Sequence, residues 1–429
     1  MKYPRYPKYK DSGVEWMGEV PEGWEKWKLS HAFETIGSGT TPKSDIDLYY
    51  DGNIPWVTTS ELREEEIFKT NNYITELALA DCSALKIYPK GTLLIAMYGA
   101  TIGRLGLLAI EATCNQACCA LAIEIQLSSR FIFFWLQGMR SVLLSFASGG
   151  GQPNLSQEFI RSIVVPAPPK SEQKNITDFL DHNCVKIDAL IAEQEKLIAL
   201  LKEKRRAVIS HAVTKGLNPD APMKDSGVEW IGEVPNGWET LTIRRITECL
   251  DGKRIPLNSE QRYGKIGNIP YWGANSIVDY IDEALFDETL ILLGEDGAPF
   301  NDKTKQVAFF SQGPIWPNNH VHTLRPSQDI DAKYIVYLLN ITEFGFYING
   351  STREKLTQSE MNNIVALMPP LPEQHSIATF LDAETAKIDA LIAESEKAVA
   401  LLKERRGALI SAAVTGKIDV RDIPLKEAV

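Results

Sequence analysis

Two long stretches of the chain repeat the same pattern of apolar and polar positions. Residues 172–214 read EQKNITDFLDHNCVKIDALIAEQEKLIALLKEKRRAVISHAVT, and residues 373–415 read EQHSIATFLDAETAKIDALIAESEKAVALLKERRGALISAAVT. In both, apolar side chains recur in alternating steps of four and three, which is the pattern of a coiled-coil seam. The residues between them are mostly Glu, Lys and Ala, which favour helix. Each stretch is therefore predicted to form one helix of roughly 60 Å, at about 1.5 Å per residue.

One such helix cannot bury its apolar stripe by itself. Its copy offers a matching stripe, and the long segment between the copies allows the two helices to run antiparallel. The alternative is that each helix packs separately on the globular part beside it. The positions predicted to pair the two helices are Ile176, Leu180, Ile187, Leu190, Leu197 and Leu201 in the first copy, and Ile377, Leu381, Ile388, Leu391 and Leu402 in the second.

Polar residues interrupt the predicted seam at the same three places in both copies. A polar residue in a coiled-coil seam commonly fixes the register, and we interpret these residues in that way, not as ligands. They are Asn183 with Glu384, Gln194 with Ser395, and Lys204 with Arg405.

A shorter repeat stands before each long one. Residues 9–25 read YKDSGVEWMGEVPEGWE, and residues 223–239 read MKDSGVEWIGEVPNGWE. Their offset is 214 residues, against 201 for the long copies, so the regions between the repeats differ in length. The apolar and aromatic side chains of the short block are interpreted as packing anchors: Val14, Trp16 and Trp24.

The order of short block, variable region and long helix therefore occurs twice. Both variable regions contain short strand-like runs, such as TLLIAM at 92–97 and TLILL at 289–293, followed by helical stretches around 130–145 and 332–346. The predicted fold is α+β, with two mixed α/β domains separated by two long helices in an antiparallel coiled coil and an internal pseudo-two-fold repeat. The predicted segments are 1–25, 26–167, 168–216, 217–239, 240–367, 368–416 and 417–429, of which 26–167 and 240–367 are the variable domains.

Composition and charge narrow the functional classes. The net charge of −11 argues against nucleic-acid binding over the whole surface, but it permits a local basic face. The six cysteines form no CxxC pair, so a reducing cytoplasm is expected, without a metal or disulfide framework. No apolar signal segment opens the chain. The apolar run at 92–110 holds three glycines, which favours two buried strands and a turn over a membrane span.

Catalytic motifs are missing from the sequence. It has no GxxxxGK[ST] phosphate loop, no HExxH, and no Asn-Pro-Pro-aromatic or Asp-Pro-Pro-aromatic tetrapeptide of a base methyltransferase. His320 and His322 could pair on one strand face, but a third metal ligand is lacking, so no metal site is predicted. Glu295 and Asp296 are interpreted as a turn or a polar contact, not a nuclease pair. No catalytic residue is predicted.

Side chains suited to phosphates and base edges punctuate both variable regions. Arg can bridge the guanine O6 and N7 atoms, Asn or Gln can bridge the adenine N6 and N7 atoms, and Lys suits phosphates. Any single one could equally be a solvated surface residue. The DNA-binding candidates in the first region are Lys43, Thr58, Thr59, Ser60, Tyr98, Arg104, Gln116 and Gln152. Those in the second are Lys253, Arg254, Trp272, Asn275, Lys303, Lys305, Asn319, His320, Arg353 and Lys355.

With these motifs assembled, the chain resembles the specificity subunit of a type I restriction–modification system over nearly its whole length. The resemblance rests on the entries PPKSEQ and PPLPEQ, the duplicated KIDALIAE helices, the two DSGVEW blocks, and the stretches GNIPW and LLIAMYGATIG. It implies two target recognition domains, each reading one half of a bipartite, asymmetric site in double-stranded DNA. It also implies that the helices separate these domains and dock the modification subunits, two of them.

The resemblance places the chemistry outside this chain. Adenine methylation from S-adenosylmethionine would belong to the modification subunits, and ATP- and Mg-dependent translocation and cleavage to the restriction subunits. No cofactor and no membrane contact are expected for this chain, and its acidic charge predicts weak DNA binding without its partners. Two other hypotheses remain open at this stage. The chain could be a coiled-coil scaffold with two protein-binding modules, or a methyltransferase with unrecognised motifs.

Overall fold

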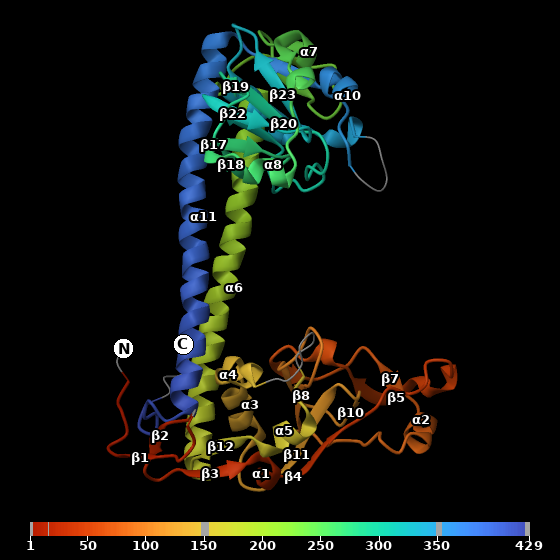
Figure 1. Ribbon diagram of the computed structural model, residues 1–429, viewed down its shortest axis with the longest axis vertical. Helices are drawn as coiled ribbons and strands as arrows, with labels where there is room; N and C mark the ends of the chain where they lie inside the picture. The colour runs from red at the N-terminus through yellow and green to blue at the C-terminus, as the bar shows by residue number, and fades with distance from the viewer. Residues whose placement is uncertain (1–2, 16, 147–153, 349–353, 425–429) are drawn as a thin grey trace. The chain divides into compact units, whose positions relative to one another are not determined.

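The protein folds into two units, each of which contains part of both long helices. The computed structural model describes residues 3–15, 17–146, 154–348 and 354–424, and Trp16 lies outside them (Figure 1). Unit 1 comprises Met1–Glu193 and Ala398–Val429, and unit 2 comprises Gln194–Lys397. Below, module 1 and module 2 are the globular parts of unit 1 and unit 2.

The long helices are α6 (Lys170–Lys215) and α11 (Leu371–Val414), and they run antiparallel (Figure 1). In unit 1, the start of α6 meets the segment that follows α11: Trp24 donates from Nε1 to Glu172 (2.9 Å), and Gly416 lies against the same tryptophan. In unit 2, Trp238 donates to Glu373 (3.2 Å) and Gly216 packs beside it. The tryptophan and glutamate that both repeats contain therefore make the same joint in both units.

The glutamine of each PPxxEQ entry joins a long helix to its module. Gln173 accepts from the backbone N–H of Ser128 (2.8 Å), and Gln374 accepts from that of Asp331 (2.9 Å). Ser128 and Asp331 are the N-caps of α3 (Ser129–Gly138) and α9 (Ala332–Ile341). Each glutamine therefore fixes a module helix at its first turn, where backbone donors lack partners within the helix.

The seam between α6 and α11 corrects three of the eleven predicted pairing positions. Leu180, Ile187 and Leu201 are buried as expected, but Leu190 (49 % exposed), Leu197 (42 %) and Leu391 (50 %) face outward. At every second position of the predicted seam, the residue that faces the other helix is the next one along the chain. These residues are buried or half-buried: Cys184, Ile191, Ile198, Thr385, Ile392 and Val399. The remaining predicted positions, Ile176, Ile377, Leu381, Ile388 and Leu402, are also buried or half-buried.

The reason for this shift lies in the polar interruptions. The predicted stripe would place Asn183 and Glu384 inside the seam, whereas the observed stripe replaces them with Cys184 and Thr385, which are smaller and uncharged. Burying a charged carboxylate without a partner is costly. KIDALIAE has Leu and Ile at adjacent positions. The helix can therefore rotate so that Ile instead of Leu faces its partner, without losing buried apolar area.

The shared aspartate of KIDALIAE forms an ion pair with the opposite helix in each unit. In unit 1, Arg406 Nε lies 2.8 Å from Asp188 Oδ1, and in unit 2, Arg205 Nε lies 2.8 Å from Asp389 Oδ1. The two pairs are copies of each other under the 201-residue repeat. The motif therefore encodes the antiparallel register, which explains why its aspartate is kept in both copies.

Reversing one charge of such a pair is expected to destabilise the helix pair slightly. Asp188→Arg places two cations together, and we expect a loss of about 0.5–1 kcal/mol in the free energy of unfolding because the pair is partly exposed. Asp188→Arg with Arg406→Asp restores the attraction and should recover most of that loss in urea denaturation. Equal stability of the single and double variants would contradict this role.

Module 1 contains a five-stranded sheet and a three-stranded sheet. The strand order of the first is β4-β11-β8-β9-β6 and that of the second β10-β5-β7, and a third pair, β12-β3, adjoins the long helix. The strands are β3 (Glu25–Lys28), β4 (Phe33–Ser38), β5 (Tyr50–Val57), β6 (Glu65–Ile67), β7 (Tyr73–Ile74), β8 (Leu93–Ala96), β9 (Leu105–Leu108), β10 (Thr113–Cys114), β11 (Cys118–Glu124) and β12 (Val164–Ala167). The helices are α1 (Leu29–Ala32), α2 (Glu76–Asp81), α3, α4 (Arg140–Ser145) and α5 (Gln157–Ser162).

Module 2 repeats this plan with two four-stranded sheets, β16-β23-β20-β21 and β18-β17-β22-β19, and the pair β15-β24. The strands are β15 (Glu239–Thr242), β16 (Thr247–Cys249), β17 (Ile266–Trp272), β18 (Ile277–Ile281), β19 (Phe286–Asp287), β20 (Leu290–Gly294), β21 (Ala308–Ser311), β22 (Pro314–Pro317), β23 (Val321–Pro326) and β24 (Val365–Met368). The helices are α7 (Ile243–Ile246), α8 (Ser259–Tyr263), α9 and α10 (Gln358–Asn363).

The short blocks form the hairpins β1 (Tyr9–Asp11) with β2 (Glu19–Pro21) and β13 (Met223–Asp225) with β14 (Glu233–Pro235). The predicted strands in TLLIAM and TLILL are confirmed as β8 and β20, and all their residues are buried. The apolar run at 92–110 forms the antiparallel strands β8 and β9. Within the described ranges, no helix is long and apolar enough to cross a membrane.

Candidate nucleic-acid interface

Several candidates of module 1 gather on loops at the ends of its strands. Thr41 donates to the side chain of Gln116 (2.7 Å), and the Asn115 N–H donates to Val57, the residue before Thr58 (3.0 Å). The Met97 N–H donates to Ala117 (2.8 Å), which brings Tyr98 to the same place. We call the loops 39–46, 58–60, 97–104 and 115–117 loop edge 1. Lys43, Thr59, Ser60 and Arg104 lie on it as well, and Gln152 lies outside the described residues.

The threonine and serine of loop edge 1 are partly held by their own turn. Glu61 accepts from the Thr58 N–H (3.0 Å) and from the Thr70 hydroxyl (2.7 Å), and Thr58 and Ser60 share a hydrogen bond (2.8 Å). This capping arrangement fixes the turn after β5. Ser60 is exposed at the tip, so its hydroxyl can reach an outside ligand.

The candidates of module 2 gather on the matching loops, which we call loop edge 2: residues 251–254, 273–276, 295–306, 318–320 and 354–356. The Asn318 N–H donates to the Trp272 carbonyl (2.9 Å), and Asn275 donates to the Gly297 carbonyl (3.1 Å). Lys355 lies opposite Asp296 in an isolated bridge. Lys253 and Asn319 are exposed there, and Arg353 lies outside the described residues.

Some predicted cations of module 2 are already balanced by acids. Lys303 lies 2.7 Å from Glu343, and Lys305 lies 3.2 Å from Asp302. Arg254 is largely buried and lies 2.8 Å from Glu295 while donating to the Val321 carbonyl (2.7 Å). Arg254 therefore positions loop edge 2 from inside, instead of offering a free guanidinium to a phosphate.

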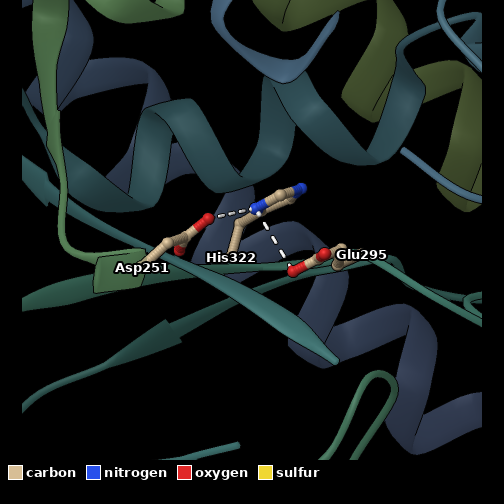
Figure 2. Close-up of side chains that lie close together, drawn as sticks. All are labelled: Asp251, Glu295 and His322. Carbon is tan, nitrogen blue, oxygen red and sulfur yellow. Dashed lines mark hydrogen bonds and ion pairs between the residues drawn. The ribbon is translucent and has the colours of Figure 1, made fainter. Parts of the chain in front are cut away.

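A buried cluster of charged side chains lies beneath loop edge 2. Figure 2 shows the His322 ring between the carboxylates of Asp251 and Glu295. Its Nδ1 is 2.6 Å from Asp251 and 3.7 Å from Glu295, and its Nε2 is 2.9 Å from the Leu356 carbonyl oxygen. With Arg254, the cluster joins the loops that follow β16 and β20 to the start of β23 and to residue 356. We call these four side chains the charged cluster.

His320 and His322, which the sequence allowed to pair on one strand face, do not share a face. His322 points into the module and is 1 % exposed, whereas His320 precedes β23 and lies 3.6 Å from Asp296. Alternating side chains of a strand share a face, but His320 stands before the strand begins, so the alternation does not reach it. The sequence reasoning also missed Asp251, because it lies 71 residues from His322.

The electrostatics of Asp251 follow from its neighbours. Burial opposes ionisation of this carboxyl group, but hydrogen bonds from the His322 ring and the Thr323 N–H, together with the charge of Arg254, outweigh it and hold its pKa below the usual 3.8. The ionised carboxylate therefore stabilises the fold above about pH 4, and this contribution is lost as the pH falls through the lowered pKa.

Asp251, Glu295 and His322 also have the composition of a three-ligand metal site, with ligand atoms within 4.8 Å of one another. The arrangement of their neighbours does not fit one. Arg254 already lies 2.8 Å from the Glu295 oxygen that faces His322, and 3.4 Å from Asp251. Its positive charge would repel a metal ion bound to these carboxylates. The Arg254 guanidinium already neutralises the two carboxylates, so we interpret the cluster as a structural ionic network.

Module 1 has no charge at the positions that match this cluster. Strand register equates Cys119 with His322, because Cys119 pairs with Ile95 in β8 and His322 pairs with Leu293 in β20. Met97 matches Glu295, because the Leu155 N–H donates to the Met97 carbonyl and the Leu356 N–H donates to the Glu295 carbonyl. Ile36 of β4 matches Cys249 of β16, because they pair with the matching residues Leu121 and Leu324. Ser38 and Asp251 each follow two residues later and therefore match as well. The two loop edges therefore share a backbone plan and differ in chemistry.

Comparisons with known proteins agree with the duplicated plan. A family model, the type I restriction modification DNA specificity domain, matches residues 21–200 and 235–400. The chain is 25 % identical to the type I restriction enzyme MjaIX specificity subunit of Methanocaldococcus jannaschii, over 95 % of this chain and 96 % of that protein. It is 23 % identical to the StySPI specificity subunit of Salmonella potsdam, over 94 % and 90 %.

Solved structures share the fold. One comes from work described as the structural basis of complex assembly and conformational transition of the type I R-M system; it has a TM-score of 0.69 and 14 % identity, and the match covers 92 % of this chain and 98 % of that one. The HsdS subunit of Thermoanaerobacter tengcongensis gives a TM-score of 0.51 at 14 % identity, over 93 % and 98 %. The two matched domains span most of the sequence, and the chain belongs to the family of type I restriction–modification DNA specificity subunits.

Proposed function

We propose that loop edge 1 and loop edge 2 each read one half of a bipartite site in double-stranded DNA. The observation that carries this proposal is the repeated backbone plan with different side chains at the same places, such as Gln116 against Asn319 and Tyr98 against Asp296. Two modules of one plan present their loops in the same way, so unlike side chains imply unlike half-sites. The bipartite site is therefore asymmetric.

The exposed polar side chains of the loop edges are the proposed contacts. Lys43, Lys253 and Lys355 suit phosphates, and Asn319 and Gln116 suit adenine edges. Trp272 and Thr58 shape the loops that carry them. Because the chain has a net charge of −11, DNA affinity without partner subunits is proposed to be weak and strongly salt-dependent.

Exposed leucines on the long helices are the proposed docking sites for two modification subunits. Unit 1 exposes Leu190 (49 %) and Leu401 (55 %), and unit 2 exposes Leu391 (50 %) and Leu200 (52 %). The 201-residue repeat equates Leu190 with Leu391 and Leu200 with Leu401, so each unit carries the same pair. Single exposed apolar side chains are common on protein surfaces, so the support for this proposal is their recurrence at matching positions of both units. One modification subunit on each unit explains why the leucines are duplicated.

Replacing the leucine pair of one unit is expected to remove one modification subunit. Leu190→Asp with Leu401→Asp should halve the stoichiometry of co-purified modification subunit, since a charge in an apolar interface centre costs several-fold to a hundredfold in affinity. Leu391→Asp with Leu200→Asp is the matched variant for unit 2. Glu193→Asp, an exposed change on the same helix, should leave both subunits bound. Unchanged stoichiometry in both leucine variants would contradict the proposal.

The chemistry is proposed to lie in the partner subunits. Modification subunits would supply adenine methylation from S-adenosylmethionine, and restriction subunits would supply ATP- and Mg-dependent cleavage. This chain would choose the DNA and hold the partners on it. A cytoplasmic location is proposed because the substrate would be cellular DNA.

The decisive experiment is mapping of methylated adenine across the host genome, with and without the gene for this chain. Loss of one bipartite adenine motif on deletion supports the proposal and gives the site. Exchange of residues 240–367 for the equivalent part of another specificity subunit should then change one half-site and leave the other. A methylome that is unchanged by deletion, in a host whose modification subunit co-purifies with this chain and is active, would overturn it in favour of a protein-binding scaffold.

A further inference from the structure

Module 1 contains an apolar groove between helix α4 and the segment that enters strand β12. The groove has a volume of about 200 Å³, which is enough for one aromatic ring but below the roughly 300–1,000 Å³ of sites for drug-sized molecules. Phe146 lines the groove and is 53 % exposed, so the groove opens to solvent. Most side chains of the wall are apolar, and they include Val142, Leu143, Phe146, Phe159, Ile163 and Val164.

Module 2 fills the equivalent space with a side chain of its own. Tyr347, which follows the short 3₁₀ helix η4 (Phe344–Phe346), is half-buried against the core of module 2. Its hydroxyl accepts a hydrogen bond from the N–H of Val365, the first residue of β24 (3.4 Å). Val365 matches Val164, the first residue of β12, under the 201-residue offset. The Tyr347 ring therefore bridges, in module 2, the two segments that flank the groove of module 1.

The length of the connection before β12 or β24 explains the difference between the modules. From N-cap to N-cap, it runs from 128 to 156 in module 1 and from 331 to 357 in module 2, so it is two residues longer in module 1 (28 against 26). The longer connection forms the helix α4 where module 2 has only η4. Phe146, just after α4, rests against the Phe159 ring (centroids 6.3 Å apart), which leaves the groove open.

The groove keeps the backbone donor that module 2 uses to hold its tyrosine. The Leu29 N–H donates to the Ile163 carbonyl, so these two residues occupy a hydrogen-bonded position of the antiparallel pair β12-β3. Val164 and Lys28 form the next pair, which is not hydrogen-bonded, and the Val164 N–H therefore points away from β3. Within the described ranges no group accepts from this N–H, whereas its copy donates to Tyr347. A ring that carries a hydroxyl would give it the same partner.

We propose that this groove of module 1 receives the side chain of one tyrosine from a partner protein, with the tyrosine hydroxyl accepting from the Val164 N–H. Tyrosine combines an apolar ring with a polar tip, which matches the apolar wall, the ring-sized volume and the single donor of the groove. Because module 2 supplies its own ring, one such tyrosine is needed per chain. No residue of the wall belongs to loop edge 1, so the groove is separate from the proposed DNA-reading surface.

The first test uses the full-length chain and p-cresol, which is the tyrosine side chain without its backbone. Ligand-observed NMR is expected to show saturable binding with a dissociation constant of about 1 mM, a usual affinity for so small a molecule. In a chain labelled with ¹⁵N-valine, the Val164 amide resonance should shift during the same titration. This second readout locates the bound probe in the wild-type chain, so it does not depend on any variant.

A substitution on α4 copies the filled state of module 2. Val142→Trp places a ring in the groove from the chain itself and should weaken p-cresol binding at least about tenfold, because the probe and the new side chain compete for one space. Ser141→Trp is the matched control, since Ser141 is exposed and lies outside the wall, and it should leave binding unchanged. No saturable binding by the wild-type chain, or equal binding by Val142→Trp and Ser141→Trp, would overturn the proposed site.

The second test asks who supplies the tyrosine, and it rests on the proposed function in expecting the partner within the restriction–modification complex. The assembled complex should bind no p-cresol, because the partner already fills the groove, and Val142→Trp should assemble more weakly than Ser141→Trp. Equal p-cresol binding by the complex and the free chain would overturn the proposed partner. Loss of binding when the free chain is merely concentrated would overturn it too, in favour of a second copy. The methylome of the host tests DNA reading separately, so failure of one proposal can be told from failure of the other.

Discussion

Arg254→Ala is expected to be the most damaging single replacement in module 2. Its guanidinium lies between Glu295 (2.8 Å) and Asp251 (3.4 Å), and all three side chains are at most 14 % exposed. Removing one partner of a buried ionic network typically costs about 3–5 kcal/mol. Lys355 also lies 3.4 Å from Glu295, but its side chain is half-exposed and cannot replace the buried guanidinium. Urea denaturation of the full-length chain measures the loss in stability, and hydrogen exchange locates it: amides of β20 and β23 should exchange faster, and those of β8 and β11 should not change.

Arg325→Ala is the matched control. Arg325 also meets two carboxylates, Glu248 and Glu288, but its side chain is 38 % exposed. Water replaces the lost partner there, so a loss of at most about 1 kcal/mol is expected. Arg254→Met with Glu295→Met removes a charge of each sign and should cost less than Arg254→Ala. Similar losses for Arg254→Ala and Arg325→Ala would show that the charged cluster does not stabilise module 2.

The same variant tests what the cluster does for recognition. The charged cluster ties together the loops that make up loop edge 2, whereas module 1 has Ser38, Met97 and Cys119 at the matching places. At a temperature where Arg254→Ala stays folded, adenine methylation by the complex should lose selectivity in the half-site read by module 2. The other half-site should keep its sequence. Loss of selectivity in both halves would indicate a general defect of assembly instead.

The duplicated frame could be predicted from the sequence because repetition removes ambiguity. Two copies of one pattern at an offset of 201 residues identify the helices, and β8 and β20 stand out as short apolar runs bounded by turn residues. The face by which each long helix packs on the other was harder to predict. Leu190 and Ile191 are equally apolar, and only the cost of burying Asn183 and Glu384 selects the stripe that contains Ile191.

The position of the candidate residues at strand ends could be predicted from the sequence, but their side-chain contacts could not. Residues such as Thr58, Tyr98 and Gln116 fall at strand ends. Thr58 follows β5 of the three-stranded sheet, Tyr98 follows β8 of the five-stranded sheet, and Gln116 lies in the turn that connects β10 of the first sheet to β11 of the second. The pairing of Arg254 with Glu295 depends on which way each side chain turns from its loop, and it crosses 41 residues of sequence. Sequence patterns of period 2 or 3.6 carry no information about such contacts.

The repeated ion pairs give a sharp prediction for the spacing of the half-sites. Asp188 and Arg205 are separated by the same 17 residues along α6 as Asp389 and Arg406 along α11, and each residue pairs across the seam. Inserting one heptad after Glu193 and another after Glu394 keeps both pairs and the phase of the seam. The added length is about 10 Å, at 1.5 Å per residue, which is about three base pairs of DNA at roughly 3.4 Å each.

We therefore expect the doubly lengthened chain to direct methylation to the same two half-sites with a spacer about three base pairs longer. An insertion in α6 alone cannot keep both ion pairs in register, so that variant should retain its half-sites but lose stability of about 1 kcal/mol or more relative to the matched insertion. Methylome mapping reads spacer and half-sites in one experiment. Altered half-site sequences with an unchanged spacer would refute the assignment of spacing to the helices, because lengthening α6 and α11 leaves every residue of both loop edges in place.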